Sequence, residues 1–431
     1  MKWNSEYKAL VWMIVLFLAA YFLPLETLQF RQAVFEALAL AKWYAREHVL
    51  LCLIPAFFMA GFISVFISQG AIIKYLGAQA KKWVAYGMAS VAGSVLAVCS
   101  CTILPLFASI YQRGAGLGPA VAFLYSGPAI NVLAIILTMN VLGVEIGIAR
   151  IIGAVSFSIV IGLVMHFIYR KEEKERQAAD IVMPQENGTP LWKTAAHFLI
   201  LAGILVFTNW GKPTQTDCAC YAIWAQKGDI AAIFGILFAL SLVFIIKLKP
   251  LHVLVAAAFV TLAAFLFPGH ILAPFVAAIV ALTLILAVNS GEPKEWLDST
   301  WSYTKQIMPL LAIGVLIAGF LLGSPGGNGI IPGEWITMLV GGNSLIANFF
   351  ASIVGAFMYF ATLTEIPILQ GLMANGMGKG PALALLLAGP ALSLPNMLVI
   401  RSVIGTQKTV VFVCLVMVMA TISGIVYGAL F

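Results

Sequence analysis

Two cysteines separated by a single residue, Cys99 and Cys101, stand just ahead of Pro105. In a continuous helix, side chains two positions apart point to nearly opposite sides, about 200° apart around the axis. The two thiols can therefore meet on one guest only if the backbone unwinds, which the nearby proline favours. Paired thiols prefer soft, thiophilic guests to Na⁺ or Mg²⁺. The pattern predicts a transient site for a soft metalloid at Cys99 and Cys101, whereas Cys52 and Cys414 read as small apolar core residues.

Glu365 is the strongest single polar candidate in the sequence. It lies between Thr364 and Pro367 in an otherwise apolar stretch. A carboxylate inside a membrane is costly and marks a functional site by default. We expect Glu365 to carry a proton and to couple transport to a proton gradient. The alternative is a glutamate at a helix end that reaches toward the membrane surface.

Three clusters of glycine and proline occur twice in the chain at a constant spacing of 262 residues, the spacing between Pro105 and Pro367. From Thr102 to Ala129, 12 of 28 positions are identical to their counterparts, without a gap. This register predicts a duplication, with a first repeat over about 45–169 and a second over about 303–431. The second copy has Ala361 and Leu363 where the first has its cysteines, so the site is expected to be asymmetric.

Proline explains why these clusters matter. Proline has no backbone N–H, so within a helix it leaves the carbonyl four residues earlier without its partner. Broken backbone survives at membrane depth only where protein covers it or where it lines a watery cavity. Interrupted helices at matching places in two halves are a good pointer to a transporter's central site. The candidate substrate-binding residues at these breaks are Pro105, Gly127, Pro128, Asn131, Pro367, Gly389, Pro390 and Asn396. The alternative is that the prolines only kink ordinary membrane helices.

Composition fixes the environment of these elements. Apolar residues make up 62% of the 431 residues and charged residues only 10%, and the mean hydropathy is +1.02. A soluble protein carries about 25% charged residues, so most of this surface must face lipid. We expect an all-α polytopic membrane protein with about 13 transmembrane or re-entrant helices in two repeats with Gly/Pro-broken helices. Whether the repeats are parallel or inverted stays open, because one miscounted span reverses the answer.

One polar stretch divides the chain. Residues 170–190 are charged and end in turn residues, so we expect a cytoplasmic linker between a first transmembrane half, 1–169, and a second, 191–431. A weak excess of basic residues on one side of this topology places the linker and the end of the chain together in the cytoplasm.

Other chemistries lack their signatures. No Walker A loop, dinucleotide-binding glycine pattern or zinc-binding histidine pair is found, so we expect no cofactor and no ATP hydrolysis. The net charge of +7 is spread between apolar runs rather than clustered, which argues against nucleic acid as a partner. The expected partners are a small inorganic or organometalloid substrate and the lipid bilayer, with a homo-oligomer as one option.

The segment CSCTILPLFASIYQRGAGLGPAVAFLYSGPAINVLAIILT resembles the bacterial predicted-permease family that includes the ArsP-type arsenical efflux proteins. The resemblance extends over most of the chain. It implies a multi-pass permease of the cell inner membrane. Efflux of trivalent organoarsenicals in related members implies recognition by thiols, a role that would fall to Cys99 and Cys101.

These observations predict a secondary transporter that exports arsenite or a trivalent organoarsenical, and not an enzyme. Transport of a sulfur or selenium compound is an alternative. A membrane thiol oxidoreductase that uses Cys99 and Cys101 with Cys218 and Cys220 is another, although a site deep in the membrane is poorly placed to reach the disulfides of other proteins.

Overall fold

A computed structural model describes residues 26–67, 80–96, 100–179, 191–210, 219–268, 272–323, 339–357, 365–374 and 376–431, together with positions 10, 11, 13, 14, 17, 18, 21, 22, 24, 76, 329 and 330. In these residues the regular structure is helical, apart from one isolated bridge between Gly341 and Met377. Five helices are long and apolar enough to cross a membrane, and several shorter apolar helices accompany them. The predicted all-α, polytopic class is confirmed.

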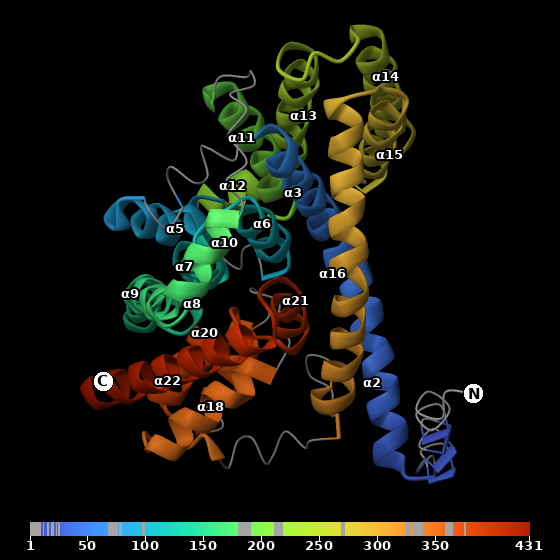
Figure 1. The fold of residues 1–431 in the computed structure, drawn as a ribbon. Helices are drawn as coiled ribbons and strands as arrows, with labels where there is room; N and C mark the ends of the chain where they lie inside the picture. The colour runs from blue at the N-terminus through green and yellow to red at the C-terminus, as the bar shows by residue number, and fades with distance from the viewer. Residues whose placement is uncertain are drawn as a thin grey trace.

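The chain begins its described core with one long helical rod. Helix α2 (Leu28–Tyr44) continues through a π-helical segment η1 (Ala45–Leu53) into α3 (Ile54–Phe66). Helix α16 (Glu292–Leu322) runs beside this rod in the opposite direction (Figure 1). A Cβ on Gly61 of α3 would meet Thr300, near the start of α16, whereas a Cβ on Gly319, near its end, would meet Ala37 of α2. Close approach at both ends of the contact fixes the antiparallel register.

Two groups of helices flank this pair. The first group contains α5 (Lys82–Leu96), α6 (Ser100–Gln112), α7 (Leu117–Ala129), α8 (Val132–Val141) and α9 (Val144–Ile168). The second contains α18 (Leu345–Phe357), α19 (Glu365–Ala374), α20 (Lys379–Ala388), α21 (Leu394–Ile404) and α22 (Thr406–Leu430). The remaining helices are α10 (Arg170–Ala179), α11 (Leu191–Thr208), α12 (Ala219–Ala225), α13 (Lys227–Phe244), α14 (Pro250–Leu266) and α15 (Leu272–Val288).

The two groups match element by element. Helices α9 and α22 start 262 residues apart (406 − 144) and end 262 residues apart (430 − 168). The starts of α7 and α20, and those of α8 and α21, keep the same spacing. The glycines that turn the chain with positive φ also recur in pairs, Gly114 with Gly376 and Gly143 with Gly405.

Matching glycines also set the packing inside each group. A Cβ on Gly118 of α7 would stand 2.8 Å from the carbonyl oxygen of Gly162 on α9. The counterparts 262 residues later do the same, because a Cβ on Gly380 of α20 would stand 2.6 Å from the carbonyl oxygen of Gly424 on α22. In both groups the absence of side chains lets the central helix lie directly on the backbone of the long one.

The two groups are inverted relative to each other. Lys408, at the start of α22, forms an ion pair with Glu172, which follows the end of α9. Lys379, at the start of α20, lies 3.8 Å from Glu145, at the start of α9, while the same end of α20 touches the end of α22 through Gly424. Helices α9 and α22 therefore run antiparallel. The duplication itself stays a prediction, and if the two groups are its copies this geometry makes them inverted rather than parallel.

Several expectations from the sequence change at this level. The stretch read as a linker begins as helix α10, and residues 180–190 lie outside the described part of the chain. Because α9 and α22 are antiparallel, α10 and the end of α22 lie at opposite ends of this pair, not together. Helix α6 runs through Pro105 without interruption, so the break predicted there is wrong. Pro367 is the third described residue of α19, and Leu363, whose carbonyl it was expected to free, lies outside the described residues.

Candidate functional site

Two helices end inside the protein, one in each group. Helix α7 ends at Ala129, one residue after Pro128, and α8 begins at Val132. Helix α20 ends at Ala388, and Gly389 and Pro390 lie in the turn that leads to α21. Every residue of α7 is buried, and so is every residue of α20 after its first. Both breaks are thus covered by protein, the condition for interrupted backbone at membrane depth.

The backbone at each break is partly satisfied within the break itself. The N–H of Ile130 donates to the carbonyl of Ser126, and that of Leu392 to the carbonyl of Ala388. The hydroxyl of Ser393 accepts from the N–H of Asn396 and caps α21. Asn131 is buried at the first break, and Asn396 is buried at the second with a side-chain oxygen that has no hydrogen-bond partner among the described residues.

A buried ion pair joins the two groups at these breaks. The Nη2 atom of Arg150, on α9, donates to Oε1 of Glu365, the first residue of α19, over 2.6 Å. The side chains of both residues are fully buried. The Nε of Arg150 donates to the carbonyl of Ala129, the last residue of α7, and Nη1 donates to the hydroxyl of Thr138 on α8. One guanidinium therefore contacts both sides of the first break and the second group at once.

The other oxygen of Glu365 faces the second break. Its Oε2 is buried and has no hydrogen-bond partner in the part of the chain that the structure describes. A Cβ on Gly389 would lie 3.8 Å from this oxygen. A buried acceptor without a partner costs about 1–3 kcal/mol, more when it is charged. Tyr125, on α7, lies within electrostatic reach of Arg150 and has a buried hydroxyl that likewise finds no described partner.

The inverted counterparts of this polar centre are apolar. At the constant spacing of 262 residues, Glu365 corresponds to Ile103 and Arg150 to Phe412, and both counterparts are buried. The two breaks are alike in backbone and unlike in chemistry. The asymmetry expected from the cysteines is a separate one and stays a prediction, because Cys99 lies outside the described residues.

The thiol candidates fall largely outside what the structure describes. Cys99 and Cys218 lie outside the described residues, and of Cys101 and Cys220 only the backbone is described, in α6 and α12. Cys52 is buried, as predicted, whereas Cys414 is exposed, so the core position predicted for it is wrong. The prediction that Cys99 and Cys101 bind a guest therefore stays a prediction.

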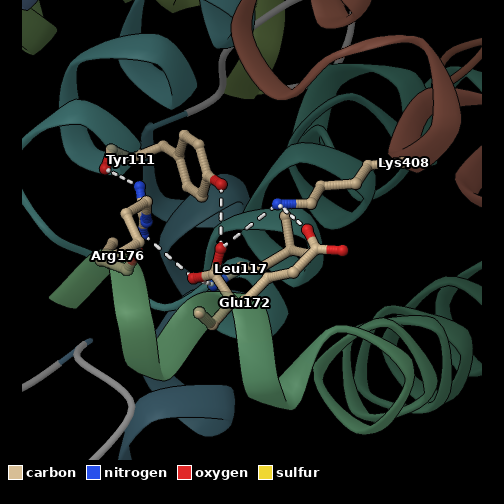
Figure 2. Close-up of polar contacts among 7 residues, drawn as sticks. Tyr111, Leu117, Glu172, Arg176 and Lys408 are labelled. Atoms are coloured by element: carbon tan, nitrogen blue, oxygen red, sulfur yellow. Dashed lines mark hydrogen bonds and ion pairs between the residues drawn. The ribbon is translucent and has the colours of Figure 1, made fainter. Parts of the chain in front are cut away.

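A second contact between the groups lies at the end of α9, where Tyr111, Glu172, Arg176 and Lys408 come together (Figure 2). Glu173 of α10 is at its centre, because it contacts Tyr111, Arg176 and Lys408. The hydroxyl of Tyr111 donates to Oε1 of Glu173, and the backbone N–H of Leu117 donates to Oε2, each over 3.0 Å. Arg176 donates to Oε2 of Glu173 and to the carbonyl of Ala115. Helix α10 thereby fastens the turn that precedes α7.

Lys408 brings the second group into this cluster. Its Nζ points at Glu172 (Figure 2), 3.1 Å away, and lies 3.7 Å from the nearly fully buried Glu173. It also stands over the ring of Tyr169. At the opposite end of α9, the described residues form an exposed contact between Lys379 and Glu145, at 3.8 Å. The ion pairs at the end of α9 that carries α10 are therefore shorter and more buried than the contact at its other end.

Sequence reasoning found Glu365 but missed Arg150 and Glu173. Arg150 had a usable signal, because a lone arginine inside the apolar 25-residue stretch of α9 marks a functional site by the same rule as Glu365. Glu173 had none, because it stands in a run of mixed charges that looks solvated.

Comparison with known proteins agrees with this architecture. The sequence model of a family described as "Predicted permease" matches residues 34–429. The chain belongs to this predicted-permease family. The match contains both groups of helices and everything between them. It supports a membrane transporter rather than an enzyme.

Two curated relatives extend the comparison. The UPF0718 protein MJ0584 of Methanocaldococcus jannaschii is 41% identical over 389 residues, which are 89% of this chain and 93% of that protein. The UPF0718 protein YraQ of Escherichia coli is 28% identical over 145 residues, which are 33% of this chain and 38% of that protein. Because the first relative is archaeal, the similarity is not confined to bacteria. No solved structure matches the chain.

Proposed function

We propose that this permease is a secondary transporter whose substrate site lies between the two inverted groups, at the breaks of α7–α8 and α20–α21. The observation that carries the proposal is the buried pair of Arg150 and Glu365, which joins the two groups where both helices are interrupted. Inverted repeats with broken helices suit alternating access, in which one group rocks against the other around a fixed site.

The proposed cargo is a thiophilic metalloid, arsenite or a trivalent organoarsenical, exported across the inner membrane. Membership of the predicted-permease family supports transport, and the resemblance to arsenical efflux proteins at Cys99 and Cys101 supports the cargo. Soft thiols form strong bonds to such guests. Transport of a sulfur or selenium compound is the second candidate, because the buried polar groups at the breaks also suit an oxygen-rich solute.

Glu365 is the proposed proton carrier. Protonation would neutralise its carboxylate and weaken its hold on Arg150, so that the contact between the groups loosens when a proton is bound. A buried arginine left without its partner is unfavourable. Protonation of Glu365 would therefore destabilise the closed conformation and favour a conformational change.

Expression in an arsenic-sensitive host tests the cargo. We expect wild-type protein to confer resistance, and Cys99→Ser or Cys101→Ser to abolish it, with Cys414→Ser as the matched control because Cys414 is exposed and distant in sequence. Unchanged resistance with both thiols replaced would reject thiol binding.

Everted vesicles test the coupling. We expect an imposed pH gradient to accelerate uptake of labelled arsenite by the wild-type protein and to have no effect on Glu365→Gln. A variant that still responds to the gradient would reject Glu365 as the proton carrier.

A further inference from the structure

Among the described residues, the hydrogen-bonding capacity of Arg150 is only partly used. Its three described bonds, to Ala129, Thr138 and Glu365, occupy three of the five N–H groups that a guanidinium offers. Both terminal nitrogens keep a second N–H. Arginine presents these donors in a rigid planar fork that suits oxygen acceptors.

The partner of Arg150 has the complementary capacity. Oε2 of Glu365 is a buried acceptor with no hydrogen-bond partner among the described residues, and it faces Gly389, where no side chain intervenes. The pair therefore offers donors and an acceptor side by side, next to both helix breaks.

We infer that the Arg150–Glu365 pair binds a small hydroxylated oxyacid, which accepts hydrogen bonds from the guanidinium and donates an O–H to Oε2 of Glu365. This inference rests on the proposed function and names the substrate class for its site. The chemistry is shared by arsenous acid, hydrogen selenite and hydrogen sulfite, because each carries both an acceptor oxygen and an O–H group.

The same pair rejects other classes of solute. A bare metal cation is repelled by the guanidinium, and a fully deprotonated oxyanion brings negative charge against the carboxylate with no proton to share. An apolar guest offers no hydrogen bond to either the guanidinium of Arg150 or the carboxylate of Glu365. Selectivity then depends on the O–H group, and selenate and sulfate, which carry none at neutral pH, are excluded.

The position of the pair makes this one site and not two. Arg150 belongs to the first group and Glu365 to the second, whereas their inverted counterparts, Phe412 and Ile103, offer no polar atom. A rocking motion that parts the groups separates Arg150 from Glu365 and opens the space between them to an oxyacid. The ion pair is the closed, empty form of the site.

Binding to the purified full chain tests the inference, with labelled arsenite and labelled selenite as separate probes and selenate as competitor. We expect saturable binding of at least one hydroxylated probe and no competition by selenate. Glu365→Gln is expected to weaken that binding at least tenfold, and Lys379→Gln, which removes an exposed ion pair, to change it less than twofold. The probe that binds tells arsenic from selenium.

A second variant guards against loss of folding. Gly389→Ala leaves the ion pair intact and places a methyl group 3.8 Å from Oε2, so it should also weaken binding while the protein elutes and melts as wild type. The inference is overturned if wild-type protein binds neither probe, if selenate competes equally, or if Glu365→Gln and Gly389→Ala both bind as wild type.

Transport in proteoliposomes distinguishes failure of this inference from failure of the proposed function. If the wild type moves arsenite or a trivalent organoarsenical and these variants keep its KM, only the inference falls, and if the wild type moves neither, the proposed function falls.

Discussion

Among single residues, Arg150 and Glu365 matter most, because each buried charge is stable only while the other is present. The free-energy cost of removing two charges from water is offset only by their mutual attraction and by further hydrogen bonds. Ala129 and Thr138 accept such bonds from Arg150. Removing one partner leaves the other charge buried and uncompensated, which costs about 3–5 kcal/mol. Replacing both by neutral groups avoids that penalty.

Arg150→Met should therefore destabilise the protein strongly, and the double variant Arg150→Met/Glu365→Gln should recover most of the loss. Thermal unfolding in detergent measures both, with Lys379→Met as the control because its ion pair is exposed. A double variant as unstable as Arg150→Met would show that Glu365 is not the partner that matters.

Of the pair Arg150 and Glu365, the sequence predicted one residue and not the other. Glu365 was predicted because a carboxylate in an apolar stretch is costly wherever it lies, a property of one residue. Its partner lies 215 positions away on a different group, and no local pattern links them. The thiols could be proposed from residue type alone, but whether they converge depends on backbone between 97 and 99, outside the described residues.

At the scale of elements, the two groups are built on the same glycine contacts. Gly162 and Gly424 let the long helices α9 and α22 touch the buried helices α7 and α20 backbone to backbone. The sequence match from Thr102 to Ala129 contains Gly118 but not Gly162. The similarity could therefore be seen in the sequence, but the contact between Gly118 and Gly162 could not. The spacing of 262 residues recurs in the bounds of the helices, but which way the two groups run became clear only from which ends meet.

Alanine at either contact should push the helices apart. A Cβ on Gly162 would stand 2.7 Å from the carbonyl oxygen of Gly118, and one on Gly424 2.6 Å from that of Gly380, and both distances demand a shift. We expect Gly162→Ala and Gly424→Ala each to cost about 1–3 kcal/mol of stability. Gly235→Ala on α13 meets nothing within 4 Å and is the control, expected to be neutral or stabilising. Equal melting temperatures for all three variants would contradict the packing.

At the scale of the whole molecule, inversion changes the topology. The ion pair of Lys408 with Glu172 places the start of α22 at the end of α9, beside α10. Basic residues gather at this end: Lys82 and Arg170 lie within electrostatic reach of His166, and Arg176 donates to the carbonyl of Ala115. Lys379 lies at the other end of α9, beside Glu145.

The positive-inside rule then predicts that α10 and the residues after it face the cytoplasm, and that α22 ends on the other side. A protease site placed at residues 186–187 should resist an impermeant protease in spheroplasts, and a tag after Phe431 should be removed by it. Everted vesicles should give the opposite result. Cleavage of both sites from the same side would contradict the inverted arrangement.

The central claim is that a substrate crosses because one group moves against the other. Transport in proteoliposomes, with the groups tied together, tests it most directly. Cysteines replace Glu145 and Lys379 at one end or Glu172 and Lys408 at the other, joined by a short reducible bis-thiosulfonate linker, with each single variant as the control for native thiols. We expect either cross-link to stop transport and a reductant to restore it. Cross-linked protein that transports at the wild-type rate would rule out movement of one group against the other.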